Sequence, residues 1–190
     1  MRTPTLFFAL ALAASAASAQ GQQPATPPAT PQPSSPAQRP APCTAAEFRQ
    51  FDFWIGAWTV AGPDGKEQGR SDITREAFGC AINEHWQGWN SVPGVSINYF
   101  DRGDGKWHQH WVGGGGLILH LAGNFDGKAM VMSGERDTPQ GRVWDRITWT
   151  PLADGRVSQQ WDASTDGGKT WKTTFLGYYT RRASAKAEGK

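Results

Sequence analysis

Short runs of alternating apolar and polar residues fill most of the chain between residues 58 and 182. An apolar/polar period of two is typical of β-strands that bury one face, and helix-period apolar stripes are absent over the same region. The sequence therefore predicts an all-β domain and argues against a helical bundle. A first strand is expected to begin at residues 58–60, and further strands at 67–77, 80–89, 95–101, 106–112, 117–124, 128–135, 142–151, 156–163 and 171–182.

Asp-Gly pairs stand in four of the connections between these runs, at Asp64, Asp104, Asp126 and Asp154. Asp-Gly is the strongest short hairpin signal, because a type I′ turn needs positive φ at both central residues. About ten antiparallel strands joined in sequence order close most simply into an up-and-down barrel, which leaves no free sheet edge. A barrel of this size is wide enough to hold a small ligand.

A further connection, residues 164–171, reads Ser-Thr-Asp-Gly-Gly-Lys-Thr-Trp and matches the S-x-D-x-G-x-T-W pattern of the Asp-box hairpin of sialidase-like propellers. The Asp166 carboxylate is expected to bond amides of the turn, with Trp171 packed beneath it. The pattern occurs once, so it indicates a structural hairpin and neither a propeller nor a sialidase.

A short helix is expected ahead of the first strand. Thr44 and Glu47 have the spacing of a capping box, and Phe48 and Phe51 then fall on one helical face. Gly56 is expected to end this helix.

The first 42 residues divide into an export signal and a linker. Arg2, the apolar run 6–13 and Ala17-Ser18-Ala19 form a secretory signal with cleavage after Ala19, and the apolar run is too short to span a membrane. Residues 20–42 hold eight prolines and are expected to be an extended tether or, alternatively, a Pro-rich ligand. Residues 183–190 are expected to be a disordered tail. The mature protein is therefore expected in the periplasm or outside the cell.

Cys43 and Cys80 are the two cysteines of the chain. In an oxidising compartment such a pair indicates a disulfide, which here would pin the entry segment to the barrel wall. Two free thiols or a metal pair are the alternatives, although distant single cysteines are a poor metal signature.

Composition narrows the class of partner. Ten tryptophans and 23 glycines in 190 residues suit half-buried strands and tight turns. With 19 basic and 17 acidic residues the chain is nearly neutral, which argues against nucleic-acid binding or a polybasic membrane patch.

The two ends of the predicted barrel resemble the calycin superfamily, which includes lipocalins, fatty-acid-binding proteins and nitrobindin-like haem barrels. The resembling residues are Gly56-x-Trp58 and the run 178–182. The resemblance implies that Arg181 or Arg182 lies across the Trp58 indole, with the aromatics of 51–54 plugging that end of the barrel. The axial His of haem-binding relatives comes late in the chain, but no His follows His120 here, so no haem or other cofactor is expected.

More closely, the chain resembles the DUF1579-type secreted domains, a bacterial family of unknown function. The resemblance spans about 140 residues. It rests on Phe51-Asp52-Phe53-Trp54-Ile55-Gly56-x-Trp58, Gly79-Cys80-Ala81-Ile82-x-Glu84-x-Trp86, Gly94-x-Ser96-x-Asn98, Trp107-x-Gln109-x-Trp111-Val112, Arg146-Ile147-Thr148-Trp149 and Asp166-Gly167-Gly168-x-Thr170-Trp171. It implies a calycin-like fold and no particular reaction.

Strand alternation places several polar groups on faces that also carry tryptophans. If those faces point inward, the lumen residues are Glu84, Trp86, Ser96, Asn98, Trp107, Gln109, Trp111 and Arg146. Convergent polar groups in an aromatic cavity are typical of a small-molecule site, with Glu84 and Arg146 as its charged pair. The alternative is a polar network that satisfies itself and fixes the strand register.

Two further motifs are expected to be structural. His108 and His110 have the spacing of a strand zinc site, but they would face solvent if Trp107 faces inward, so no metal is expected. Gly113–Gly116 lacks the residues of a phosphate loop and is expected to be a mobile hairpin loop at the barrel mouth.

Three function classes remain. The first is an exported barrel that binds a small, partly apolar molecule without catalysis. The second is an enzyme, a hydrolase or isomerase, that uses Glu84 or Arg146. The third is a structural or interaction module of the cell envelope. No nucleic-acid partner and no membrane span are expected, and the oligomeric state is left open.

Overall fold

The computed structural model describes residues 43–182. The predicted signal (1–19), linker (20–42) and tail (183–190) lie outside the described residues. Within the described range, no helix is long and apolar enough to cross a membrane.

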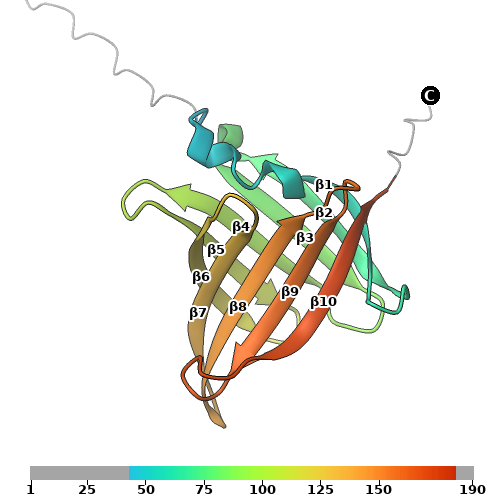
Figure 1. Ribbon diagram of the computed structural model, residues 1–190, viewed down its shortest axis with the longest axis vertical. Helices are drawn as coiled ribbons and strands as arrows, with labels where there is room; N and C mark the ends of the chain where they lie inside the picture. Colours follow the sequence, from blue (N-terminus) through green and yellow to red (C-terminus); the bar gives the residue numbers. More distant parts are fainter. Residues whose placement is uncertain (1–42, 183–190) are drawn as a thin grey trace, which may run out of the picture. The chain divides into compact units, whose positions relative to one another are not determined.

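In the described part of the chain, ten antiparallel strands form one closed up-and-down barrel, which confirms the predicted fold class (Figure 1). They are β1 (Gly56–Ala61), β2 (Glu67–Glu76), β3 (Ala81–Gly88), β4 (Gly94–Asp101), β5 (Lys106–Gly113), β6 (Ile118–Phe125), β7 (Met130–Thr138), β8 (Gly141–Pro151), β9 (Val157–Ser164) and β10 (Lys172–Arg181). Each strand pairs with its sequence neighbours, and β1 pairs with β10 to close the barrel.

The four Asp-Gly connections are hairpin turns, but the predicted type I′ geometry is wrong. Only the glycines Gly65, Gly105, Gly127 and Gly155 have positive φ there, between 70° and 94°. Each preceding Asp side chain instead accepts a hydrogen bond from the backbone N–H two residues on, at 2.8–3.1 Å. Around Asp64, Asp104 and Asp154 this bond accompanies a connection longer than two residues, in which a single left-handed glycine suffices. At Asp126 the connection has two residues, because the Asp126 amide bonds the Ala129 carbonyl, and Gly127 alone takes positive φ.

Two 3₁₀ turns precede β1 in place of the predicted helix: η1 (Ala46–Arg49) and η2 (Asp52–Trp54). The N-cap of η1 is Ala45, one residue later than the predicted Thr44, and the Ala45 side chain makes no capping bond. The helix prediction failed because the segment is shaped by packing: Phe48, Phe51 and Trp54 are all buried within it. In Figure 1 both turns lie across one end of the barrel, which we call the closed end.

Aromatic packing fills the closed end. Phe51 stacks on Trp54 at 4.8 Å between ring centroids and meets the edges of Trp107 and Trp149 at 5.6 and 5.3 Å. All four side chains are 0–1% exposed. The Trp107 indole also donates to Oε1 of Gln50 at 3.1 Å. The entry segment therefore completes the core at this end.

The first and last strands meet through Trp58 and Arg181, which are direct partners in the ladder. The Arg181 guanidinium lies 4.3 Å from the Trp58 ring centroid and donates to the Ile55 carbonyl at 3.1 Å. A Cβ on Gly56 would lie 2.4 Å from Nη1 of Arg181, so only glycine leaves room for this contact. Arg182, the other residue considered for this position, pairs with Asp72 instead.

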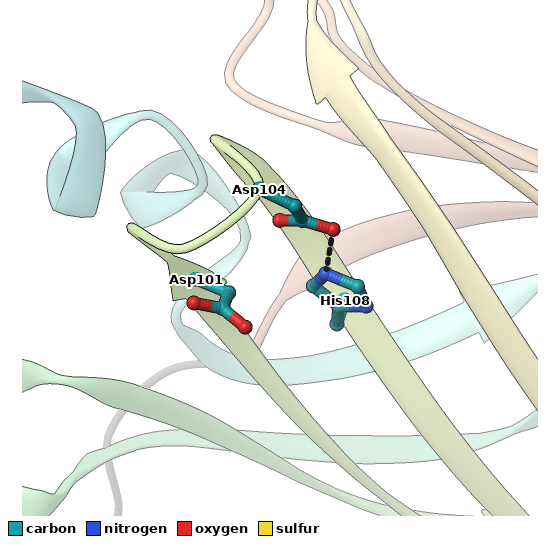
Figure 2. A group of neighbouring side chains, drawn as sticks. All are labelled: Asp101, Asp104 and His108. Carbon is teal, nitrogen blue, oxygen red and sulfur yellow. Dashed lines mark hydrogen bonds and ion pairs between the residues drawn. The ribbon is translucent and has the colours of Figure 1, made fainter.

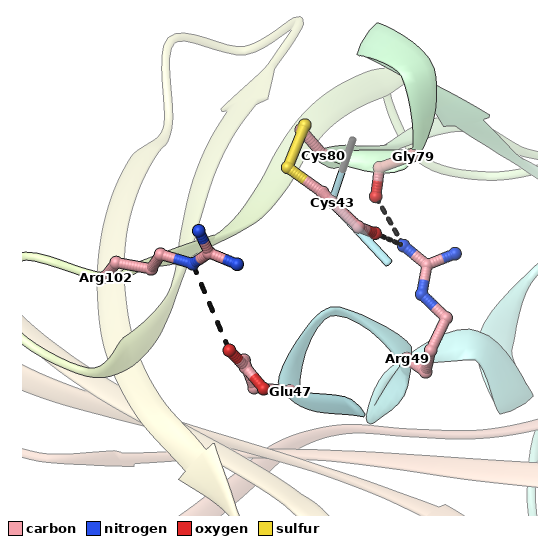
Figure 3. The surroundings of a disulfide bond; sticks show 6 residues. All are labelled: Cys43, Glu47, Arg49, Gly79, Cys80 and Arg102. Atoms are coloured by element: carbon pink, nitrogen blue, oxygen red, sulfur yellow. Dashed lines mark hydrogen bonds and ion pairs between the residues drawn. A yellow bond between two sulfur atoms is a disulfide. The ribbon is translucent and has the colours of Figure 1, made fainter. Parts of the chain in front are cut away.

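The Cys43–Cys80 disulfide is present, as predicted, and ties the chain ahead of η1 to the start of β3 (Figure 3). Arg49 reinforces the link, because its Nη2 donates to the carbonyls of Cys43 and Gly79 at 2.8 and 2.6 Å. The closed end is thus fixed covalently as well as by packing.

The Asp-box hairpin has the bonding that its motif predicts. The Asp166 carboxylate accepts from the Thr170 hydroxyl at 2.6 Å, the Thr170 amide at 2.9 Å and the Ser164 hydroxyl at 2.7 Å. These bonds lower the pKa of Asp166 to about 2. The Trp171 indole donates to the Gly168 carbonyl at 2.9 Å, so the hairpin is a structural unit.

Candidate functional site

The inner faces of β3, β4 and β5 carry the polar residues that alternation places there. Glu84, Ser96, Asn98 and Gln109 are each at most 3% exposed. They are neighbours because the ladder pairs Glu84 with Ser96 and Asn98 with Gln109. Trp107 also faces inward, but it packs at the closed end.

These polar groups form a chain of hydrogen bonds that ends on a carboxyl group. Gln109 Nε2 donates to Asn98 Oδ1 at 2.9 Å, and Asn98 Nδ2 donates to the Ser96 hydroxyl at 3.0 Å. The Ser96 hydroxyl donates to one Glu84 oxygen at 3.1 Å, and the Ser71 hydroxyl of β2 donates to the other at 2.8 Å. Every donor in the chain is oriented toward Glu84, so the bonds reinforce one another when the carboxyl is ionised.

Glu84 has no cationic partner among the described residues; its hydrogen bonds come only from the two hydroxyls. Burial raises the pKa of this carboxyl to about 7, and the bonds from Ser71 and Ser96 oppose the rise. A buried carboxyl without a counter-ion is costly when charged, since the hydroxyls replace only part of its hydration. Glu84 is therefore poised to exchange a proton near neutral pH.

A cavity of about 310 Å³ adjoins this carboxyl, in the half of the barrel away from the closed end. Most of its wall is apolar or aromatic. Its lining residues are Glu84, Trp86, Ser91, Val92, Gln109, Trp111, Gly113, Gly115, Leu117, Leu119, Ile147, Gln159, Trp161, Thr174, Phe175 and Tyr179. Of the predicted site residues, Glu84, Trp86, Gln109 and Trp111 line the cavity. Ser96 and Asn98 are not part of the lining, but they hydrogen-bond to Glu84 and Gln109, which are.

The opposite wall of the cavity comes from β9 and β10. The Tyr179 hydroxyl donates to Oε1 of Gln159, and the Trp161 indole donates to the buried Asp145 at 2.8 Å. Burial and the negative charge of Glu84 raise the pKa of Tyr179 well above its ordinary value. Tyr179 is therefore a neutral phenol that shares the electrostatic environment of Glu84.

The placement of Arg146 in the lumen is wrong. The inward residues of β8 are Asp145, Ile147 and Trp149, so Arg146 points outward. There its Nη2 pairs with Asp162 at 3.3 Å and its guanidinium stacks on Trp171 at 4.2 Å. Arg146 consequently joins the Asp-box hairpin to the barrel wall and leaves Glu84 without the predicted charged partner.

Sequence reasoning missed Tyr179, Gln159, Trp161 and Phe175. The alternation that identified β3 to β5 could have found them, because Gln159 and Trp161 share one parity on β9, as do Phe175 and Tyr179 on β10.

The histidines of β5 lie on the outer face, as expected if Trp107 faces inward. His108 stacks against Tyr99 and bonds the Asp104 carboxylate at 3.0 Å (Figure 2). Asp101 lies close enough that one ligand atom from each of the three falls within 4.8 Å of the others. Both carboxylates already accept turn amides, from Gly103 at 2.7 Å and Lys106 at 3.0 Å, so the group belongs to the β4–β5 turn.

Glycines at the end of β5 and in the β5–β6 connection lie where the cavity opens. Gly113 and Gly115 belong to the lining, beside Ser91 and Val92 of the β3–β4 connection. We call this opening the mouth.

No model of a known protein family matches the chain, and no curated protein matches it either. The resemblance to the DUF1579-type domains therefore rests on the sequence motifs alone.

Proposed function

We propose that this chain is an exported, calycin-like barrel that binds a small, partly apolar molecule in its lumen. The observation that carries the proposal is the cavity of about 310 Å³, with aromatic walls and one buried carboxyl group. Small-molecule sites have volumes of roughly 300 Å³ or more, apolar walls and a few convergent polar groups. The disulfide and the predicted signal support export to an oxidising compartment.

The other two function classes receive less support. An enzyme that used Arg146 would need that guanidinium beside Glu84, and it lies on the outer face. A proton-transfer enzyme that used Glu84 alone is favoured by one observation, the pKa of about 7, which suits general acid–base catalysis at neutral pH. A purely structural module would be expected to fill its barrel, which the cavity argues against.

The test is native mass spectrometry of the protein purified from its own cell envelope. The wild type should carry a reproducible additional small mass. Leu117→Trp, which fills the mouth, should lose that mass, because Leu117 lines the cavity. Ile118→Trp is the matched control: the next residue is 51% exposed on the outer face, and its substitution should leave the mass in place.

Two results would contradict the proposal. One is a wild-type protein without any bound mass that also fails to bind apolar probes such as 1-naphthol. The other is a bound mass that Leu117→Trp and Ile118→Trp retain equally, since the molecule would then lie elsewhere. Thermal unfolding of both variants checks that the added indole leaves the barrel folded.

A further inference from the structure

We propose that the ligand of this cavity is a small organic cation, a protonated amine on an apolar or aromatic body, whose ammonium group pairs with Glu84. This inference rests on the proposed lumen site and adds the chemical class of its occupant. It follows from the charges, the hydrogen-bonding groups and the walls of the cavity.

Charge is the first argument. The cavity lining contains one carboxyl group and no Lys, Arg or His. Glu84 is 3% exposed and receives hydrogen bonds only from the neutral hydroxyls of Ser71 and Ser96. A buried carboxylate is stabilised far better by a cation than by neutral donors. Since no side chain within residues 43–182 supplies that cation, a ligand that brings one fits the site.

Acceptors beside Glu84 are the second argument. Gln109 Nε2 donates to Asn98, and the Gln109 Oε1 atom has no hydrogen-bond partner among the described residues. The Tyr179 hydroxyl donates its hydrogen bond to Gln159, so its oxygen can still accept one from a ligand. An ammonium group has three N–H donors, so it can use acceptors next to the carboxylate, whereas an anionic ligand would meet a like charge.

The aromatic walls are the third argument. Trp86, Trp111, Trp161 and Phe175 line the cavity. Indole and phenyl faces attract organic cations and also cover apolar ligand bodies. A cavity of about 150 Å³ holds one benzene ring, so about 310 Å³ suits a two-ring body with a short side chain.

The experiment is isothermal titration calorimetry of the oxidised full chain with three probes of similar size. Tryptamine is the cation, tryptophol the neutral analogue and indole-3-propionate the anion. At pH 8 tryptamine should bind about ten- to hundredfold more tightly than tryptophol, the range typical of a charge-assisted hydrogen bond. Indole-3-propionate should bind most weakly.

Variants assign this preference to the carboxyl group. Glu84→Gln should bind tryptamine and tryptophol about equally. Glu67→Gln is the matched control, because Glu67 is exposed on β2 and lies outside the cavity lining, and it should keep the wild-type preference. Equal binding of tryptamine and tryptophol to the wild type would overturn the inference but leave a neutral-ligand site standing.

A pH series on the wild type tests the same pairing without a variant. The groups that face Glu84 are Ser71 on β2, Ser96 on β4 and the phenol of Tyr179 on β10. Asp145, which accepts from the Trp161 indole, is already paired with Arg136. An alkyl ammonium keeps its proton to about pH 10, so of the two partners in the ion pair only Glu84 should change its charge between pH 5.5 and 8.5.

Tryptamine affinity should then rise about fivefold from pH 6 to pH 7 and level off near pH 8. At pH 6 its binding should release about one proton, detected as a dependence of the heat on the buffer's ionisation enthalpy. A flat pH series without proton release would overturn the inference. If none of the three probes binds, the amine inference fails, and native mass spectrometry still decides whether the lumen holds another molecule.

Discussion

Replacing Glu84 with Gln should change how the stability of the protein depends on pH. The carboxyl has an ordinary pKa of 4.5 and a folded-state pKa of about 7. Between these values the folded chain binds more protons than the unfolded chain, so the free energy of unfolding falls as pH rises. A shift of this size corresponds to about 3 kcal/mol, since one pKa unit is about 1.4 kcal/mol.

Glutamine imitates the protonated carboxyl and carries no charge at any pH. The wild type should therefore lose about 3 kcal/mol of stability relative to Glu84→Gln between pH 4.5 and pH 8. Groups such as His110 and Asp166 titrate in both proteins, so their contributions cancel in the difference. Glu67→Gln removes an exposed carboxyl and should run parallel to the wild type.

Urea denaturation followed by tryptophan fluorescence at half-unit pH intervals measures the effect. The difference in free energy of unfolding between Glu84→Gln and the wild type should grow steadily up to about pH 7 and then become constant. If the two curves stay parallel from pH 4.5 to pH 8, Glu84 is not held in an environment that penalises its charge. A variant that is uniformly less stable would show that the amide disturbs the bonds from Ser71 and Ser96, yet the slope difference would still report the carboxyl.

Two further predictions concern the closed end. Arg181→Met should lower the free energy of unfolding by about 1 kcal/mol, because it removes the contact over Trp58 and the bond to the Ile55 carbonyl. Urea denaturation measures this loss, and an unchanged midpoint would show that the contact contributes nothing. Reducing the disulfide, whose cysteines are 37 residues apart, should lower the free energy of unfolding by about 4 kcal/mol. Urea denaturation with and without a phosphine reductant measures this difference. A loss below about 1 kcal/mol would contradict the loop-closure argument.

The strands could be predicted from the sequence because their signals are local. Asp-Gly turns and period-two alternation each involve a few neighbouring residues, and all ten strands lie within a few residues of their predicted bounds. The turn geometry was predicted less well. A carboxylate that bonds the amide two residues on favours negative φ at the Asp itself, and this competes with the type I′ turn.

The inner face of β8 could not be assigned reliably, because both of its faces carry tryptophan. Trp144 has the parity of Arg146, and Trp149 has the parity of Ile147. Asp145 lies on the inward face, and a carboxylate is an unexpected core residue, so its presence argued against that face being the buried one. It is tolerated because Arg136 pairs with it at 2.7 Å and the Trp161 indole donates to it. Those partners come from β7 and β9, so the reason lies in the tertiary structure.

Asp145 and Glu84 show two solutions to one physical problem. Each is a buried carboxyl on the inner side of the barrel, but Asp145 has a guanidinium partner and Glu84 has only hydroxyls. The stability that ionised Glu84 costs the ligand-free protein is the same free energy that a cationic ligand would recover on binding. A saturating amine should therefore reduce the fall in wild-type stability between pH 4.5 and pH 8, whereas a neutral ligand should raise the whole curve and leave its slope unchanged.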